Sequence, residues 1–301
     1  MMLHRLIRLA VSAGVIAVLL AVTDLGDLAA RLRGADLRWL AACTAGIATI
    51  TCLCALRWRW VARDLDLPLP YTRALREYFF ATLLNQVVPG GVVGDVARTL
   101  RVTQPGDLRR AAQSVVIERA LGQIATLLLL ALGLIVSLSI PGGIIWPLWV
   151  FAALAGGVVL ALATRVMKKR SGPNAASFFA PLWIVLRKRH QIALAILTAL
   201  LLNFSFYASA RAVGTILPLA AFFTVIPMIL SAMLIPLSVG GWGWREGAAA
   251  VLFPLAGATA AQGVAAGIAY GACMLLAALP ALAFLALRPN SAASELISKP
   301  S

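Results

Sequence analysis

The chain contains 301 residues, of which 61% are hydrophobic and only 12% are charged. Soluble globular domains carry about 25% charged residues, so this composition excludes a soluble protein and indicates a polytopic, all-α membrane protein. The formal net charge of +15 comes from lysines and arginines in short blocks between apolar runs. This arrangement is typical of residues that set membrane topology, and we therefore expect no nucleic-acid partner.

Six stretches of the chain are candidates for full membrane spans, each of which requires about 20 apolar residues. We predict spans at about 6–23, 37–56, 112–139, 146–164, 192–216 and 262–287. The first is predicted to be an uncleaved span, because no convincing small-residue cleavage site follows it. All spans are expected to belong to one membrane domain, residues 1–301.

Arginines determine the expected orientation of these spans. The loop after the second span contains a block of them: Arg57, Arg59, Arg63, Arg73 and Arg76. Arginine-rich loops face the cytoplasm, so the N-terminus and the C-terminus are predicted to be cytoplasmic as well. Trp58 and Trp60 alternate with the first of these arginines, and we interpret both tryptophans as anchors at the membrane interface.

Two further segments are apolar but interrupted by proline and glycine. In the first, the apolar run 78–88 is too short to cross a bilayer and is followed by Pro-Gly-Gly at 89–91. Arginines flank it on both sides, so we predict a re-entrant hairpin at about 78–97. Counting the crossings predicts a second hairpin at about 219–255, which enters from the outside. Non-helical backbone at this depth must be buried in protein or line a wet cavity.

The two glycine-rich tips occupy matching positions in the two halves of the chain. Gly90 and Gly240 lie 150 positions apart, and each is followed by a further glycine and then by an acid with an arginine close by. Each half is expected to contain two spans, a hairpin and a third span, so the halves have opposite orientations. We predict an inverted repeat of residues 1–140 and 141–301. Secondary transporters use this plan, with broken helices that form the substrate site near the midplane.

Four motifs resemble those of a known family. They are Pro-Gly-Gly-x-x-Gly-Asp-x-x-Arg at 89–98, the pair Glu118-Arg119, Ala-Arg-Ala-Val-Gly at 210–214 and Gly-Gly-Trp-Gly-Trp-Arg-Glu at 240–246. Over about residues 5–287 the chain resembles the membrane domain of bacterial lysylphosphatidylglycerol synthase, the flippase-like or multiple-peptide-resistance family. The resemblance implies movement of a lipid between the leaflets of the bacterial inner membrane. We expect no lysyl transfer by this chain alone, because no soluble aminoacyl-transferase domain follows residue 288.

Ionisable and glycine-rich positions within the apolar segments are the candidates for a substrate site. Each charge costs about 2.5–3.5 kcal/mol in a bilayer, so it must be paired or hydrated. Arginine binds phosphate through two parallel hydrogen bonds, and glycine tips offer backbone N–H donors. The predicted substrate-binding residues are Asn85, Pro89, Gly90, Gly91, Gly94, Asp95, Arg98, Glu118, Arg119, Asn203, Tyr207, Arg211, Gly240, Gly241, Gly243, Arg245 and Glu246. Those assigned to the lipid headgroup are Arg98, Arg119, Arg211 and Arg245.

Structural alternatives to these assignments stay open at the level of sequence. They are a positive-inside function for Arg98, a structural ion pair for Glu118 and Arg119, extension to the outer surface for Arg211, and interfacial anchoring for Arg245 and Glu246. Asn203 and Tyr207 either line a cavity or form hydrogen bonds across helices. Gly263, Gly267 and Gly271 recur every four residues and are predicted to form a close helix contact.

Three classes of function compete. A lipid flippase or scramblase fits the paired hairpins with basic residues; a small-solute secondary transporter has the same architecture; and the third class is a membrane enzyme, or an accessory subunit, of a lipid or polyprenyl pathway. No Walker A sequence occurs and only two histidines are present, so we expect no enzymatic activity, cofactor or metal site. The expected partner is a membrane lipid substrate, and a homodimer or a complex with a lipid-biosynthesis enzyme is left open.

Overall fold

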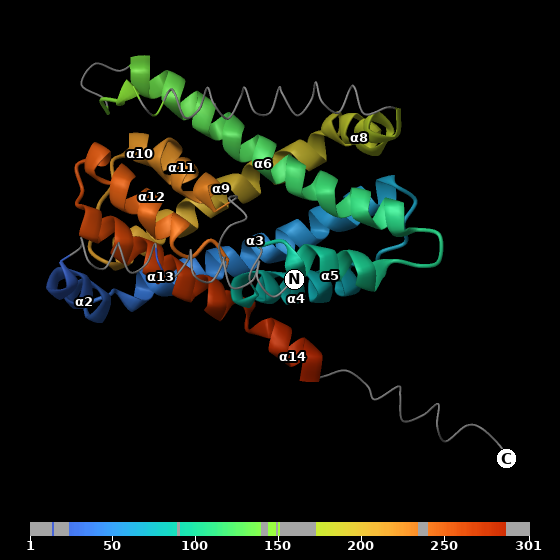
Figure 1. The fold of residues 1–301 in the computed structure, drawn as a ribbon, viewed down its shortest axis with the longest axis horizontal. Helices are drawn as coiled ribbons and strands as arrows, with labels where there is room; N and C mark the ends of the chain where they lie inside the picture. The colour runs from blue at the N-terminus through green and yellow to red at the C-terminus, as the bar shows by residue number, and fades with distance from the viewer. Residues whose placement is uncertain are drawn as a thin grey trace.

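The structure, a computed structural model, describes residues 14, 24–88, 91–139, 144–148, 150, 173–233 and 240–286. Within these ranges the chain forms helices and no β-strand (Figure 1). The helices are α2 (Leu25–Arg33), α3 (Leu37–Asp64), α4 (Tyr71–Val87), α5 (Val93–Val102), α6 (Leu108–Ser139), α8 (Pro173–Leu186), α9 (Arg189–Ala212), α10 (Leu219–Phe223), α11 (Val225–Ala232), α12 (Trp244–Leu252), η1 (Pro254–Ala256), α13 (Ala260–Ala278) and α14 (Pro280–Ala286).

Four helical stretches of this fold are long and apolar enough to cross a membrane, and the protein is therefore a multi-pass membrane protein. They are Leu37–Asp64, Leu108–Ser139, Arg189–Ala212 and Ala260–Phe284. They correspond to the predicted second, third, fifth and sixth spans. Nearly all of the predicted first span, at 6–23, and of the predicted fourth span, at 146–164, lies outside the described residues.

Two predicted helix ends require correction. The sequence placed the end of the second span at residue 56, but α3 continues to Asp64. Its last turns pack inward, because Arg57 and Trp58 are both buried. Conversely, the predicted fifth span reaches residue 216, whereas α9 ends at Ala212. The chain leaves the helix there because Gly214 adopts a left-handed conformation with φ of +79°.

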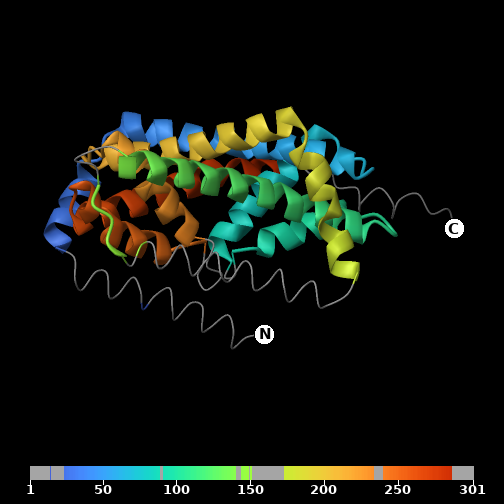
Figure 2. The same cartoon turned by 90° about the horizontal axis from the view of Figure 1, so that it is seen from above.

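Helices α3 and α9 form a long antiparallel pair (Figure 2, where α3 is blue and α9 is yellow). At one end, the backbone N–H of Asp36 donates to the carbonyl of Ala212 at 2.9 Å. At the other end, Lys188 Nζ lies 2.5 Å from Asp64 Oδ1. Midway, Gly46 faces Ser205 so closely that a Cβ atom on the glycine would lie 2.5 Å from the serine hydroxyl. This pair provides the frame against which the shorter helices pack.

Helices α4 and α5 form a hairpin, in which the end of α5 lies beside the start of α4. Arg73, in the first turn of α4, donates to the carbonyl of Arg101, in the last turn of α5, at 2.6 Å. The two helices approach closely at Gly94, where a Cβ atom would overlap the backbone of Ala81. A glycine is therefore required at this contact.

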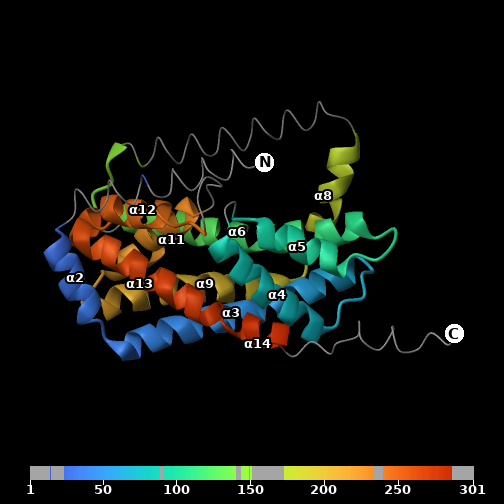
Figure 3. The same cartoon turned by 60° about the horizontal axis from the view of Figure 1, so that its bottom comes forward.

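Helices α11 and α12 form a second hairpin, which lies toward the opposite end of the bundle (Figure 3). Its tip meets the tip of the first: a Cβ atom at Gly240 would lie 2.9 Å from Oε1 of Gln86 and 3.1 Å from the carbonyl oxygen of Asn85. The first half and the second half of the chain thus contact each other through the ends of their hairpins. Gly240 has φ of +56°, so the turn also favours glycine for its backbone conformation.

The glycine stripe of α13 is a packing surface, as the sequence predicted. A Cβ atom at any of its three positions would overlap or crowd the second hairpin: Gly263 faces Ala249, Gly267 faces Glu246, and Gly271 faces Trp242 and Arg245. Residue numbers increase along α13 as those of the residues contacted in the second hairpin decrease, so α12 and α13 are antiparallel. Small residues allow two helix backbones to approach closely in a membrane protein.

Candidate functional site

Five charged side chains from α3, α5 and α6 meet inside the first half of the bundle. We call this group, Arg57, Asp95, Arg98, Glu118 and Arg119, the first cluster. Glu118 is its centre: it is fully buried and accepts hydrogen bonds from Arg57 Nη2 at 2.6 Å and from Arg98 Nη2 at 3.1 Å. A carboxylate that is removed from water needs such charged donors, since an unpaired buried charge is strongly destabilising.

Asp95 is the second acid of the first cluster and joins two arginines. Its Oδ1 accepts from Arg98 Nε at 3.0 Å, and its Oδ2 lies 2.6 Å from Arg119 Nη2. Three guanidinium groups therefore face two carboxylates, which leaves the cluster with one positive charge in excess.

Asn85 links the two arms of the first hairpin, because its Oδ1 accepts the N–H of Gly94 at 2.7 Å. This bond fixes the start of α5, and hence the position of Asp95.

Arg98 lies between two aromatic rings. Its guanidinium carbon is 4.6 Å from the ring centroid of Trp58 and 4.3 Å from that of Tyr78. Both rings are also tied to α6, since Trp58 Nε1 donates to Ser114 Oγ at 2.9 Å and the Tyr78 hydroxyl lies 3.3 Å from both oxygens of Glu118. The interpretation of Trp58 as an interfacial anchor is therefore wrong, because this side chain is fully buried over a cation.

Arg245 and Glu246 form the second cluster, at the start of α12. Arg245 Nη2 lies 2.5 Å from Glu246 Oε1, and Glu246 Oε2 accepts the N–H of Gly243 at 2.7 Å. The guanidinium carbon is 4.8 Å from the ring of Trp242 and 5.5 Å from that of Tyr270. The second cluster thus has the same composition as the part of the first cluster around Arg98 and Asp95: an arginine, an acid in the first turn of a helix, and two aromatic rings.

A short chain of contacts joins the two clusters. Gln86 Nε2 lies 3.6 Å from the sulfur of Met274, and Arg245 Nη1 lies 3.9 Å from the same sulfur. Gln86 follows Asn85, which positions the first cluster. We call this region, where Gln86 and Met274 meet Gly240 and Arg245, the tip junction.

Exposure differs sharply between the arginines of the site. The side chains of Arg98 and Arg245 are 0% exposed, whereas that of Arg119 is 44% exposed. In addition, Arg98 Nη1 and Arg57 Nε are buried without a hydrogen-bond partner among the described residues. The first cluster therefore combines an excess positive charge, unused donors and one arginine that can be reached from outside the bundle.

The remaining predicted positions fall into two groups. Gly91, with φ of +63°, lies in the turn before α5, and Gly241 packs against Met233 in the second tip; Pro89 and Gly90 lie outside the described residues. Asn203, Tyr207 and Arg211 are not brought to either cluster. They lie in the last turns of α9. Asn203 donates to the carbonyl of Phe222 at 3.2 Å, and Tyr207 packs edge-on against Trp39 and Phe222. Arg211 lies over the ring of Trp39.

Sequence reasoning missed several members of the site. Arg57 was interpreted as one of the arginines of a cytoplasmic loop, yet it donates to Glu118 and, through Nη1, to Thr198 Oγ1 at 2.8 Å. Tyr78, Gln86 and Met274 were not singled out at all. The only signal for Arg57 was its place directly after an apolar run, and neighbouring arginines that do point outward share that feature.

A comparison with models of known protein families identifies the family of this chain. The model of the lysylphosphatidylglycerol synthase TM region matches residues 5–281, a range that includes both clusters and the tip junction. A comparison with curated proteins gave no match. The match extends over nearly the whole chain and agrees with the resemblance carried by the two glycine-rich motifs, so the chain belongs to the lysylphosphatidylglycerol synthase TM region family.

Proposed function

We propose that this protein moves a phospholipid with an anionic or aminoacylated headgroup between the leaflets of the bacterial inner membrane, as a flippase or scramblase. The observation that carries the proposal is the first cluster, which has one more cation than anions and is reached through Arg119. A phospholipid brings one phosphate of the opposite sign. The family supports a lipid as the substrate class, since it is named for the membrane region of a lipid synthase.

Arg119 is the residue that we assign to the first contact with the headgroup. Its Nη2 is held by Asp95, but almost half of its side chain is accessible, so its remaining donors can bind a phosphate oxygen pair. Arg98 and Arg245 are sealed between aromatic rings in this conformation. For these two arginines to contact the headgroup in turn, the tip junction must open.

The pattern of helix contacts supports an inverted repeat as the basis of that opening. In the first half α3 contacts α4, α4 contacts α5 and α5 contacts α6; in the second half α9 contacts α11, α11 contacts α12 and α12 contacts α13. The contacts between halves correspond too, because α3 packs on both α9 and α13 while α9 packs on α6. We infer two re-entrant hairpins, one from each side of the membrane, whose tips meet near the midplane.

Leaflet exchange in proteoliposomes tests the proposal. Vesicles that contain a fluorescent phosphatidylglycerol are treated with an impermeant quencher, and the initial exchange rate is measured at matched protein incorporation. We expect Arg119→Gln to lower this rate about tenfold or more, since a charged hydrogen bond contributes about 1.5–3 kcal/mol. Arg119→Lys should retain an intermediate rate, because it keeps the charge but loses the planar fork.

Arg110→Gln is the matched control. Arg110 is 52% exposed and pairs with Asp107 at 3.6 Å, so its replacement removes the same charge from the same helix and should leave the rate unchanged. If Arg119→Gln exchanges lipid as fast as the wild type, the headgroup contact is wrong. If the wild type exchanges no lipid, the proposal is wrong. Uptake of a solute by the same vesicles would then indicate a transporter, and a change in the mass of the lipid would indicate an enzyme.

A further inference from the structure

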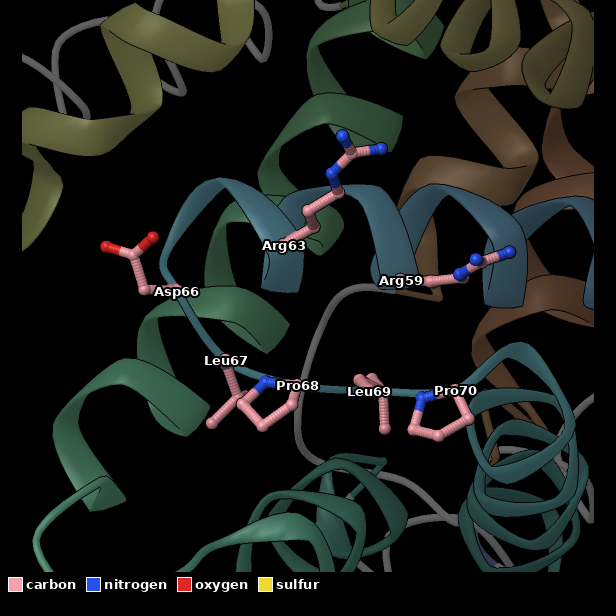
Figure 4. A pocket seen from close by; sticks show the side chains of 7 residues that line it. All are labelled: Arg59, Arg63, Asp66, Leu67, Pro68, Leu69 and Pro70. Carbon is pink, nitrogen blue, oxygen red and sulfur yellow. The ribbon is translucent and has the colours of Figure 1, made fainter.

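A second basic site lies away from both clusters, at the end of α3. Two adjoining pockets of about 560 and 520 Å³ meet at Arg63, which lines both. Both are open at the surface of the protein and are not enclosed cavities. Figure 4 shows Arg59 and Arg63 on consecutive turns of α3, with Asp66 at the turn that follows and the segment 67–70 running past the helix.

The two arginines are available for a ligand. Both are exposed, and no ion pair of either is found within the described part of the chain. They are four residues apart, so their Cβ atoms lie about 5–6 Å from each other on one face of α3. Figure 4 shows the two guanidinium groups pointing in different directions. Rotation about their side-chain bonds brings both forks to one phosphate group, which can accept hydrogen bonds from both. Asp66, at the edge of the pocket, leaves one positive charge in excess.

The walls of the two pockets differ in polarity. The first is lined on one side by Leu67, Pro68, Leu69 and Pro70, an apolar segment in which neither proline offers an N–H group. The second is polar: Trp60 packs edge-on against His190 with ring centroids 4.9 Å apart, and Lys188 is held by Asp64. A molecule that occupies both pockets therefore has an apolar part beside the leucines and prolines, a phosphate beside the arginines, and a polar group in the second pocket.

The length of α3 and its exposed arginines assign this site to the level of lipid headgroups. A helix of 28 residues is about 42 Å long, whereas the hydrocarbon core of a bilayer is about 30 Å thick. We assign the excess length to the last turns of α3 and hence to the headgroup layer, because these turns carry the exposed Arg59 and Arg63. Anionic lipids are attracted to basic residues at this depth.

We propose that Arg59 and Arg63 bind the phosphate of an anionic glycerophospholipid that resides in the leaflet around the end of α3. This lipid is not the transported substrate, since the site is separate from both clusters. It holds the end of α3 against the start of α9, because Lys188 and His190 begin that helix and line the second pocket. The inference does not depend on the proposed lipid movement.

Thermal unfolding in neutral detergent tests the site. Dioleoylphosphatidylglycerol in mixed micelles is expected to raise the Tm of the wild type by about 5 °C more than dioleoylphosphatidylcholine does. Arg59→Gln combined with Arg63→Gln should abolish the difference, while its Tm in phosphatidylcholine stays at the wild-type value. The corresponding double lysine variant should retain at most half of the difference, because lysine lacks the fork.

The control is Arg33→Gln combined with Arg38→Gln, which removes two exposed arginines from the opposite end of α3 and its preceding helix. This variant should respond to phosphatidylglycerol as the wild type does. The proposal is overturned if the double glutamine variant at 59 and 63 keeps the full shift, or if the control loses as much. It is also overturned if inorganic phosphate alone reproduces the shift, because the site would then bind a soluble anion.

Discussion

At the scale of single residues, the first cluster shows how an apolar bundle accommodates five charges. Glu118 is fully buried and is held by two arginines at 2.6 and 3.1 Å. The gain from such a pair is offset by the cost of removing the charges from water, so the pair itself adds little net stability. Removal of one partner is different, because it leaves the other charges buried without compensation.

Glu118→Gln is therefore expected to destabilise the protein by about 3–5 kcal/mol. The variant keeps the volume of the side chain but raises the excess charge of the first cluster from one to two. The measurement is the midpoint of thermal unfolding in detergent, with intrinsic tryptophan fluorescence as the signal.

Asp107→Asn provides the comparison for this residue. Asp107 is partly exposed and pairs with Arg110 at 3.6 Å, and an exposed pair contributes about 1 kcal/mol or less. Its replacement should leave the unfolding midpoint nearly unchanged. Equal losses for the two acids would contradict the view that burial makes Glu118 essential.

At the scale of helices, small residues decide how closely the elements pack. Gly46 lies where α3 crosses α9, and a Cβ atom there would be 2.5 Å from Ser205 Oγ but 3.6 Å from Ser205 Cβ. The first distance is a clash and the second is an ordinary contact. The obstacle to a larger residue is thus one hydroxyl oxygen, which donates to Leu201 of its own helix at 2.8 Å.

Gly46→Ala should destabilise the α3–α9 pair by about 1–3 kcal/mol, the usual cost of overpacking. Ser205→Ala in the same chain should recover most of the loss, because it removes the clashing oxygen. Thermal unfolding of the two single variants and the double variant gives the coupling between the sites.

Ser139→Ala is the control for that cycle. Its hydroxyl also donates to a carbonyl of its own helix, that of Ile135 at 2.8 Å, but it is exposed and is not among the groups that a Cβ atom at Gly46 would meet. It should not rescue Gly46→Ala. If Ser205→Ala fails to rescue as well, the close approach of α3 and α9 is not limited by this oxygen.

At the scale of the whole molecule, the two hairpins are directed toward each other from opposite ends of the bundle. The first turn of α4 and the last turn of α5 lie side by side through Arg73 and Arg101. The tips contact each other at Gly240 and Gln86. If the ends of α3 lie on opposite sides of a membrane, then the two hairpins open to opposite sides.

Cysteine labelling is the direct measure of this arrangement. In a variant without Cys43, Cys52, Cys54 and Cys273, single cysteines are introduced at the exposed positions Thr72, Gln104, Pro218 and Gly257. An impermeant maleimide should label the first two only from the cytoplasm and the last two only from outside. Labelling of Thr72 and Gln104 from opposite sides would exclude a re-entrant first hairpin and, with it, the inverted repeat.

The class of the protein, most of its spans and the location of its unusual segments follow from the amino-acid sequence alone. Composition and the lengths of apolar runs are local properties, so they predicted the membrane helices α3, α6, α9 and α13. The charged residues after the glycine tips were also recognisable, because a charge within an apolar segment is costly and stands out. Helix ends were less accurate, since the end of α3 depends on what its last turns pack against.

Which of these charges meet is known only from the folded protein. Glu118 binds Arg57, which lies 61 positions earlier in the chain, and no local pattern distinguishes Arg57 from Arg59. The difference is rotational: around α3, Arg57 and Trp58 are buried against the other helices, whereas Arg59 and Arg63 are exposed and line surface pockets. Helix rotation is set by packing against α6 and α9, which involves residues from distant parts of the chain. For the same reason, the meeting of Gln86 and Gly240 at the tip junction could be seen only once the two halves were folded together.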